Sequence, residues 1–350
     1  MTAPFARERH VAELAVLRAS VLTKKVLSSV SEITKADASP VTVADFAAQA
    51  LLIAALAAAF PSDAFLGEEA SEALRNDAAL RDRVWELVSS TSLADPETGA
   101  ALASPASVDE MLDLIDLGGR GQGGPTGRFW VMDPIDGTAT FLRGEQYAVS
   151  LALIEDGREV LGVLGCPNLR LQDGHVKESN VDTDGLGILL SAVKGQGSSI
   201  RTMTAHGLEP ARPLPALTAT PDLAEMHIID CLTSKSSRHD LIRRLADSFG
   251  APFPSTEVWS SHIRYAALIV GGGDLHVRIP ATPETKMYVW DHAGAQLIFT
   301  EVGGTVTDLD GRAIDFAAGR DLSRNRGLIA ARDGIHELVL KRLPDILKDQ

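Results

Sequence analysis

The stretch RFWVMDPIDGTATFLRGEQYAVSLALIEDG, residues 128–157, decides the fold because it joins a strand, a polar loop and a hairpin. Residues 128–132 are aromatic and β-branched, which predicts a strand, and the Asp-Pro pair at Asp133 predicts that a loop follows it. Further on, two apolar runs flank an Asp-Gly pair at Asp156, a strong indication of a β-hairpin. This part of the chain therefore predicts antiparallel strands beside a loop that carries acids.

Towards the N-terminus the sequence predicts helices. Residues 11–30 have apolar side chains at helical spacing and contain neither Gly nor Pro. A second helix is expected from about Val43, where Ala and Leu dominate. Residues 89–127 are rich in Ser, Gly, Pro and Asp, which predicts a surface excursion around one short helix at 108–117. After the hairpin, residues 187–203 predict another strand pair, so the first part of the chain is α+β.

The second part of the chain alternates between strands and helices, which is typical of an α/β fold. Strands are expected at 226–232, 275–280, 305–309 and 327–331, and helices at 237–249, 261–273, 291–304 and 335–343. A Pro-rich polar stretch at 202–220 separates the two patterns. We expect two domains, 1–202 and 203–350.

The composition is that of a soluble globular protein: 350 residues, 45% hydrophobic and 23% charged. The net charge of -14 opposes binding to nucleic acid. Cys166 and Cys231 are too few and too far apart for a disulfide framework or a zinc site. The start lacks the apolar core of a signal peptide, and the apolar run 50–60 is too short to span a bilayer. We expect a cytoplasmic protein with no membrane partner.

Carboxylates gather where secondary structure changes. An acid at a helix start is equally well explained by capping and by the helix dipole. The segment DPIDGT is different, because Pro134 stiffens the turn, Gly137 permits close approach, and two acids three residues apart can converge on one cation. Oxygen ligands of this kind suit a hard ion such as Mg²⁺. The acids concerned are Asp45, Glu68, Glu69, Asp133, Asp136 and Asp291.

Three segments carry a resemblance to a known family: GEE (67–69), DPIDGT (133–138) and WDHAG (290–294). They resemble the signature motifs of the lithium-sensitive, magnesium-dependent phosphatases, a superfamily that includes inositol monophosphatases, fructose bisphosphatases and 3'(2'),5'-bisphosphate nucleotidases. The segments SPVTVADFAAQ, FLRGEQYAV and GCPNL are most similar to bisphosphate nucleotidases of fungal and plant type. The resemblance, which runs from about residue 11 to 343, implies an inositol-monophosphatase-like sandwich with alternating αβαβα layers and the site between the domains.

The resemblance also implies a catalytic site. It assigns two or three Mg²⁺ ions to Glu68, Asp133, the main-chain carbonyl of Ile135, Asp136 and Asp291. It makes Thr138 and Asp45 the pair that activates the attacking water. Acids placed so close together repel one another, so we expect bound cations to relieve that repulsion. The same cations would dominate the field that an anionic substrate meets, despite the acidic chain.

Substrate contacts implied by the resemblance fall on Thr140, Ser236, His239, Ser261, Arg264 and Arg278. Arg278 lies in an otherwise apolar strand, so it needs an anionic partner. Tyr265 is close enough in sequence to flank a base. A competing explanation for Arg264 and His239 is that they are ordinary solvated residues of helices, with no role in substrate binding.

The resemblance implies that the protein hydrolyses 3'-phosphoadenosine 5'-phosphate to AMP and phosphate, in support of sulfur assimilation, as a monomer or weak homodimer. The alternative is an inositol polyphosphate 1-phosphatase or an inositol monophosphatase-type sugar phosphatase. The segment FLRGEQYAV argues against it, because inositol monophosphatases typically have a shorter loop at this place. A non-catalytic protein of the same fold is disfavoured by the complete set of acids. Haloacid-dehalogenase-type phosphatases carry D-x-D-G-T, whereas the spacing here is D-x-x-D-G-T.

Overall fold

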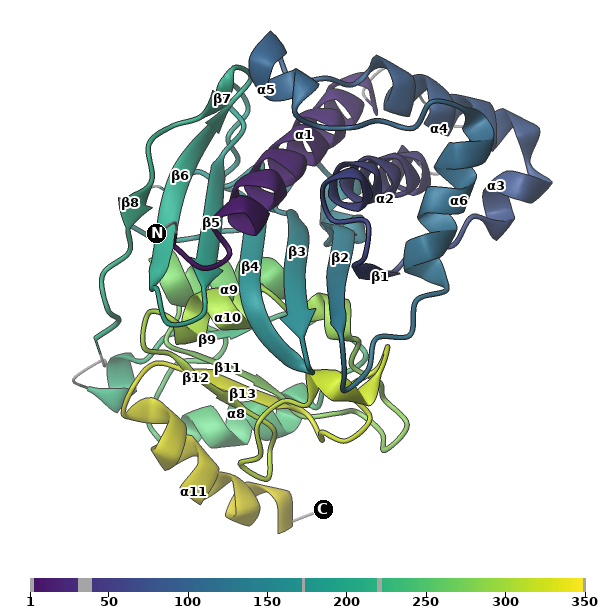
Figure 1. Ribbon diagram of the computed structural model, residues 1–350. Coiled ribbons are helices and arrows are strands. Elements are labelled where there is room, and N and C mark those ends of the chain that lie inside the picture. The colour runs from purple at the N-terminus through teal and green to yellow at the C-terminus, as the bar shows by residue number, and fades with distance from the viewer. Residues whose placement is uncertain (1–2, 31–39, 172–173, 219–221, 349–350) are drawn as a thin grey trace.

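The computed structural model describes residues 3–30, 40–171, 174–218 and 222–348. Helices and sheets alternate in five layers, α, β, α, β and α, as Figure 1 shows from top to bottom. The expected layered sandwich is therefore confirmed. Ser39, the first residue of the SPVTVADFAAQ segment, lies outside the described residues.

The first layer consists of two long helices, α1 (Ala6–Val30) and α2 (Pro40–Ala59). Helix α1 starts before the expected residue 11, and Glu8 in its first turn suits the helix dipole. The Ala- and Leu-rich α2 buries Leu52 and Leu56 completely against the sheet below. This apolar packing, rather than propensity alone, holds the layer in place.

The large sheet lies beneath these helices. Its strand order is β1-β2-β3-β4-β5-β6-β7, with β8 paired to β6. Among the strand pairs that the described residues form in this sheet, β1–β2 is parallel and the others are antiparallel. The expected hairpin is confirmed: positive φ angles of 49° at Asp156 and 72° at Gly157 turn the chain between β3 and β4. The strands are β1 (Ala64–Gly67), β2 (Arg128–Asp136), β3 (Ala148–Glu155), β4 (Arg158–Cys166), β5 (Ile188–Val193), β6 (Ser198–Thr204), β7 (Gly207–Leu208) and β8 (Arg212–Pro213).

The segment between β1 and β2, which includes the excursion expected at 89–127, contains more helices than the one predicted. Beyond the expected helix, now α6 (Val108–Gly119), it contains α3 (Glu72–Asn76), α4 (Ala78–Ser90) and α5 (Pro96–Ala100). Helix α4 packs against α2 through an apolar face that includes Val84. A short helix, α7 (Thr138–Leu142), follows β2 directly.

The middle layer is formed by α9 (Ser261–Val270) and α10 (Ala295–Thr300), which lie between the two sheets. The small sheet has the order β10-β9-β11-β13-β12, and α8 (His239–Asp247) and α11 (Ile335–Lys348) cover its outer face. The expected alternation is thus present. Its strands are β9 (Ile228–Asp230), β10 (Thr256–Glu257), β11 (Leu275–Arg278), β12 (Thr305–Thr307) and β13 (Leu328–Ala331), and the 3₁₀ turns are η1 (Leu223–Glu225), η2 (Val289–Asp291) and η3 (Phe316–Ala318).

The division expected between residues 202 and 203 falls inside β6, and the large sheet continues through β8 to Pro213. The chain passes from the large to the small sheet between Pro213 and Ile228. A two-domain division of this molecule stays a prediction. Among the helices of the described residues, none combines the length and apolarity needed to cross a bilayer.

Candidate active site

The DPIDGT segment begins within a strand, not in a loop as the sequence predicted, because β2 continues through Asp136. The β2–β3 pairing shifts here: Asp133 pairs with Ser150 and Asp136 pairs with Ala148. Two residues of β2 therefore face one residue of β3, which is a β-bulge. Residues three apart in a regular strand point to opposite faces, and the extra residue of a bulge returns them to the same face. The bulge explains how the D-x-x-D spacing brings both acids to one site.

Asp133, Asp136 and Asp291 form the acidic cluster of the site. One carboxylate oxygen from each lies within 4.8 Å of the others. Asp133 is buried, and its Oδ1 has no hydrogen-bond partner among the described residues. A buried carboxylate oxygen without a partner is costly unless a cation binds it. The all-oxygen donor set and the orphaned oxygen both fit a hard metal ion.

Asp136 is oriented by the first turn of α9. Its Oδ2 accepts hydrogen bonds from the Ser260 hydroxyl and from the main-chain N–H of His262, the latter at 2.7 Å. The neighbouring Gly137 has φ of 96°, and a Cβ there would lie 2.8 Å from Oγ1 of Thr140 and 3.0 Å from Cβ of Ser260. Only glycine fits this turn. The loop of the large sheet and the helix of the middle layer therefore meet closely at the acidic cluster.

Asp291 is held by a loop that is anchored on both sides. Nε2 of His262 lies 2.8 Å from the carbonyl oxygen of Trp290. On the other side, the N–H of Gly294 donates to Glu159 of β4 at 2.9 Å. The loop lies so close to β4 that a Cβ on Gly162 would come 2.7 Å from Cα of Gly294. These contacts fix Asp291 against the large sheet.

The Gly-Glu-Glu segment is shaped by Gln49 of α2. The Gln49 amide donates to the carbonyl of Glu69 at 2.7 Å, and its oxygen accepts from the N–H of Glu69 at 3.0 Å. A Cβ on Gly67 would lie 2.5 Å from the same amide oxygen, so the close approach requires glycine. Glu68 in this turn is exposed overall. Burial raises the pKa of Asp45 on α2, and the charges of Glu69 and Glu68 raise it further.

The acids of the site strongly perturb one another in the metal-free protein. Loss of hydration, with the charges of Glu69 and Asp291, raises the pKa of Glu68 to about 8. Burial and the charge of Asp136 raise the pKa of Asp291 to about 7. Burial raises the pKa of Asp133 as well. Each of these carboxyl groups resists ionisation because it has lost hydration and its neighbours are also acidic. A bound cation would stabilise their ionised forms.

Thr138 and Asp45 lie on two helices that pack together, α7 and α2. Thr138 is the exposed first residue of α7 and follows the cluster directly. Asp45 is buried on α2, and burial, followed by the charges of Glu69 and Glu68, raises its pKa. Their joint action on water stays a prediction, as does the metal contact of the Ile135 carbonyl.

A cavity of about 240 Å³ opens beside the acidic cluster. It brings together four of the six side chains that were expected to contact substrate, together with two acids of the cluster. The lining residues are Asp136, Asp230, Ser234, Ser236, Ser237, Ser261, Arg264, His276, Arg278 and Asp291.

Two arginines of this cavity have no carboxylate within ion-pair distance among the described residues. Arg264 donates to the carbonyl of Trp259 at 2.7 Å. Arg278 donates to the carbonyl of Lys286 at 3.1 Å and weakly to the Ser236 hydroxyl at 3.4 Å. Burial lowers the pKa of Arg278. The charge of Asp291 acts on both guanidinium groups, but neither has a carboxylate within ion-pair distance among the described residues, so the pair is suited to binding an anion.

The other two expected substrate contacts are engaged with the protein. The hydroxyl of Thr140 is buried and donates to the carbonyl of Gly137 at 2.7 Å. The ring nitrogens of His239 lie 2.6 Å from Oδ2 of Asp230 and 2.7 Å from the carbonyl of Ser234. Contact of either with a substrate stays a prediction.

Tyr265 does not flank a substrate, and the expectation that it could was wrong. Its side chain is only 1% exposed and packs against Phe299 and His292 in the middle layer. The residue faces the interior because Arg264, its neighbour on α9, turns toward the cavity instead.

Sequence reasoning missed the residues that orient the acids. Ser260 was detectable, because a serine directly before a helix is a typical N-cap, and its hydroxyl does accept from the N–H of Ile263. Glu159 and Gln49 had no such pattern, since both act on main-chain groups that are distant in sequence.

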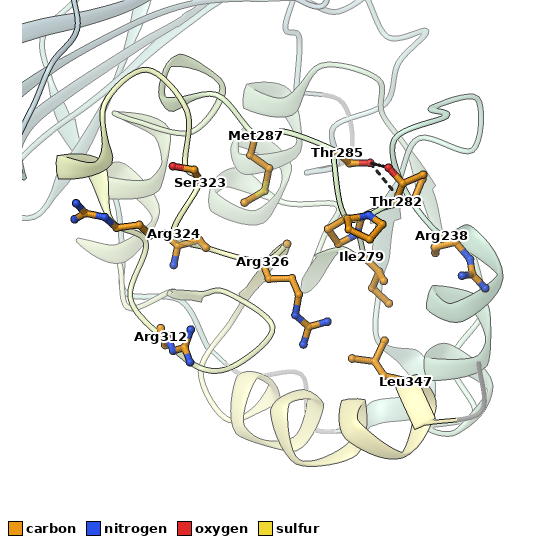
Figure 2. A pocket seen from close by; sticks show the side chains of 15 residues that line it. Arg238, Ile279, Thr282, Thr285, Met287, Arg312, Ser323, Arg324, Arg326 and Leu347 are labelled. Atoms are coloured by element: carbon orange, nitrogen blue, oxygen red, sulfur yellow. Dashed lines mark hydrogen bonds between the residues drawn. The ribbon is translucent and has the colours of Figure 1, made fainter.

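A larger cavity, of about 390 Å³, lies elsewhere in the small-sheet half. Figure 2 shows it between the loop of Thr282 and Thr285, the loop of Arg324 and Arg326, and Leu347 of α11. Its arginines are paired with acids, as in the 2.8 Å contacts Arg324–Asp315 and Arg326–Asp310. None of the three clustered aspartates lines it, so the smaller cavity is the candidate active site.

Comparisons with known proteins agree with this geometry. The family model described as "Inositol monophosphatase family" matches residues 7–348. A protein of Emericella nidulans named 3'(2'),5'-bisphosphate nucleotidase is 40% identical over 352 residues, covering 98% of this chain and 99% of its own. One of the same name from Oryza sativa is 36% identical over 357 residues, covering 99% and 96%.

Among solved structures, Mycobacterium tuberculosis SuhB matches with a TM-score of 0.57 and 20% identity, covering 97% of each chain. At that identity the likeness concerns the fold, and it agrees with the five layers described above. With a family match over nearly its whole length and relatives at this level of identity, the chain belongs to the inositol monophosphatase family.

Proposed function

We propose that this protein is a magnesium-dependent 3'(2'),5'-bisphosphate nucleotidase that hydrolyses 3'-phosphoadenosine 5'-phosphate to AMP and phosphate. One observation carries the proposal: the acidic cluster adjoins a cavity with two arginines, Arg264 and Arg278, that have no carboxylate within ion-pair distance among the described residues, although the charge of Asp291 reaches both. A bisphosphate has two anionic groups, and this site offers two separate means of binding them. The names of the Emericella and Oryza relatives support the same substrate.

The residues that would hold two or three Mg²⁺ ions are Glu68, Asp133, Asp136 and Asp291, with the carbonyl of Ile135. Three of the carboxylates are brought together by the β2 bulge and the anchored loop of Asp291. Bound Mg²⁺ supplies positive charge to the phosphate and leaving oxygen and makes the attacking water more acidic. The protein contributes by holding these carboxylates at fixed positions.

Proton transfer falls to Thr138 and Asp45. The Thr138 hydroxyl would accept a proton from the attacking water and pass its own to Asp45. Burial raises the pKa of Asp45, which makes its carboxylate the better proton acceptor. Thr138 begins α7 and is separated from Asp136 only by Gly137, which supports this role.

The second phosphate would bind Arg264 and Arg278, whose guanidinium groups face the cavity from α9 and β11. Ser236 and Ser261 line the same cavity and offer hydroxyl groups to the sugar or phosphate. His239 would act from behind the cavity wall, because it contacts Asp230 and Ser234, which line the cavity. Thr140 would contact the nucleotide from α7.

The alternative substrate class is an inositol bisphosphate or another sugar phosphate, because a pair of arginines recognises any second phosphate. A phosphate-release assay with Mg²⁺ tests the choice across 3'-phosphoadenosine 5'-phosphate, inositol 1,4-bisphosphate, inositol monophosphate and fructose 1,6-bisphosphate. The proposal predicts the highest kcat/KM for the nucleotide. A higher kcat/KM for either inositol phosphate would assign the protein to the alternative class.

A further inference from the structure

Arg320 lies at the junction between the two sheets and donates to three main-chain carbonyls of the large-sheet half. One terminal nitrogen lies 3.3 Å from the oxygen of Gly118 and 2.9 Å from that of Gly121. The other lies 2.8 Å from the oxygen of Gly67. Gly67 ends β1 and directly precedes Glu68. The guanidinium group therefore fixes the main chain from which Glu68 extends.

The same side chain contacts the loop of Asp291. Its guanidinium carbon lies 4.8 Å from the centre of the Trp290 ring, and Trp290 directly precedes Asp291. The main chain takes part as well, because the carbonyl of Arg320 accepts from the N–H of Val289 at 3.0 Å. Trp290 also stacks on Tyr288, with ring centres 4.8 Å apart. Arg320 thus contacts the residue before each of two acids that belong to different halves of the molecule.

We propose that Arg320 is a positioning residue that sets the separation between Glu68 and Asp291 and so tunes the site for Mg²⁺. The inference rests on the proposed metal-dependent function. A planar guanidinium can donate several hydrogen bonds in fixed directions and lie flat on an indole at the same time. A lysine would keep the positive charge but lose this geometry. Mg²⁺ demands nearly ideal octahedral coordination, whereas Ca²⁺ tolerates irregular coordination, so a small displacement of Glu68 affects Mg²⁺ more.

The test is calorimetric binding of Mg²⁺ and of Ca²⁺ to the substrate-free protein, for the wild type and for Arg320→Lys. We expect Mg²⁺ affinity to fall about tenfold to a hundredfold, the usual range for residues that orient metal ligands, and Ca²⁺ affinity to fall much less. The melting temperature in chelator reports separately on any loss of folding stability.

Arg332→Lys is the matched control. Arg332 also donates two hydrogen bonds to a main-chain carbonyl, that of Leu268, at 3.3 and 3.0 Å, but it contacts neither half of the acidic cluster. Its substitution should lower the melting temperature while the ratio of Mg²⁺ to Ca²⁺ affinity stays at the wild-type value. Should Arg320→Lys fail to fold, Trp290→Leu removes the ring beneath the guanidinium and should lower Mg²⁺ affinity in the same selective way.

The outcomes separate the inference from the proposed function. Wild-type protein that binds no Mg²⁺ would overturn both. Normal Mg²⁺ binding by the wild type together with unchanged affinity in Arg320→Lys would overturn only the role of Arg320. Equal losses for Mg²⁺ and Ca²⁺, accompanied by a lower melting temperature in chelator, would show that Arg320 is a general structural residue rather than a positioning one.

Discussion

The main-chain N–H of His262 lies 2.7 Å from Oδ2 of Asp136, and this contact joins the middle helical layer to the large sheet. The ring of His262 also reaches the carbonyl of Trp290, next to Asp291. One residue of α9 therefore supports acids from two different segments of the cluster. The acidic site depends on the packing of the two halves, so its metal affinity and the stability of the molecule should be linked.

The first prediction concerns the stability of the metal-free protein. The pKa of Glu68 is raised from 4.5 to about 8 and that of Asp291 from 3.8 to about 7. The folded protein therefore holds protons that the unfolded chain releases, so stability is lost as the pH rises. In chelator, the melting temperature should fall between about pH 5 and about pH 8. Saturating Mg²⁺ should abolish most of this fall, because the bound cation favours the ionised carboxylates.

Thermal unfolding across this pH range, with and without Mg²⁺, measures the effect. Asp291→Asn is the control variant, because it removes one of the carboxyl groups whose pKa is raised and should reduce the pH dependence in chelator. Parallel curves with and without Mg²⁺ would contradict the link between the cluster and metal binding.

A second prediction concerns the activity itself. Hydrolysis should require Mg²⁺ and stop in chelator, and millimolar Li⁺ should inhibit it. Li⁺ is similar in size to Mg²⁺ but carries half the charge, so it can occupy a site without stabilising the leaving oxygen. Steady-state rates across Mg²⁺ and Li⁺ concentrations provide the measurement. Full activity in chelator would refute the metal-dependent mechanism.

Much of the site could be predicted from sequence because its acids lie in short segments with distinctive chemistry. Asp133, Asp136 and Asp291 were expected to converge, and they do. The strand and helix alternation after residue 226 was also correct, since short apolar runs there alternate with segments of helical spacing. The layer order came from the resemblance rather than from any local pattern.

Other features depend on contacts that no local pattern reveals. Pro134 suggested a loop, yet it lies within a bulge, one of the places where a strand tolerates proline. Helix α4 was missed although Leu80, Val84 and Val88 have helical spacing; it lies almost wholly before the excursion expected at 89–127, where no element was predicted. Arg320 donates mainly to main-chain carbonyls that are distant in the chain. Because every residue has such a carbonyl, no sequence pattern marks these partners.

A third prediction tests the close approach of β4 to the Asp291 loop. Gly162→Ala would place a Cβ 2.7 Å from Cα of Gly294, so the loop must move. We expect a loss of about 1–3 kcal/mol in the free energy of unfolding, the usual cost of overpacking, together with weaker Mg²⁺ binding. Gly99→Ala is the comparison variant, because its Cβ would lie 3.3 Å from the carbonyl oxygen of Leu93, a milder clash far from the Asp291 loop, so its loss should be smaller and Mg²⁺ binding unchanged. Denaturant unfolding of both variants gives the comparison, and equal losses would contradict it.

The fourth prediction concerns proton transfer. Asp45→Asn and Thr138→Ala should each lower kcat by roughly a hundredfold or more, the scale of lost general-base assistance. The double variant should be little worse than either single one, because both residues act on one proton path. Thr138→Ser retains the hydroxyl and should stay close to the wild type. Additive losses in kcat would mean that the two residues act independently.

The last prediction concerns substrate selection and rests on Arg278, which has no carboxylate within ion-pair distance among the described residues. If it binds the phosphate that is not cleaved, Arg278→Ala should raise the KM for 3'-phosphoadenosine 5'-phosphate about tenfold to a hundredfold. The same change should hardly affect adenosine 3'-phosphate, which has only the phosphate that the metals bind. Arg238→Ala is the control, because it removes a positive charge that is paired with Asp240 and does not line this cavity.

Comparing two substrates distinguishes recognition from folding. A misfolded variant would lose both activities together, whereas loss of a phosphate contact removes only the advantage of the bisphosphate. Wild-type enzyme should accordingly prefer the bisphosphate by a factor similar to the loss in Arg278→Ala. If both substrates are cleaved equally well and the variant loses them in parallel, Arg278 supports β11 instead, through its bonds to Lys286 and Ser236. The two-anion argument would then fail, and a phosphatase for monophosphates would account better for the site.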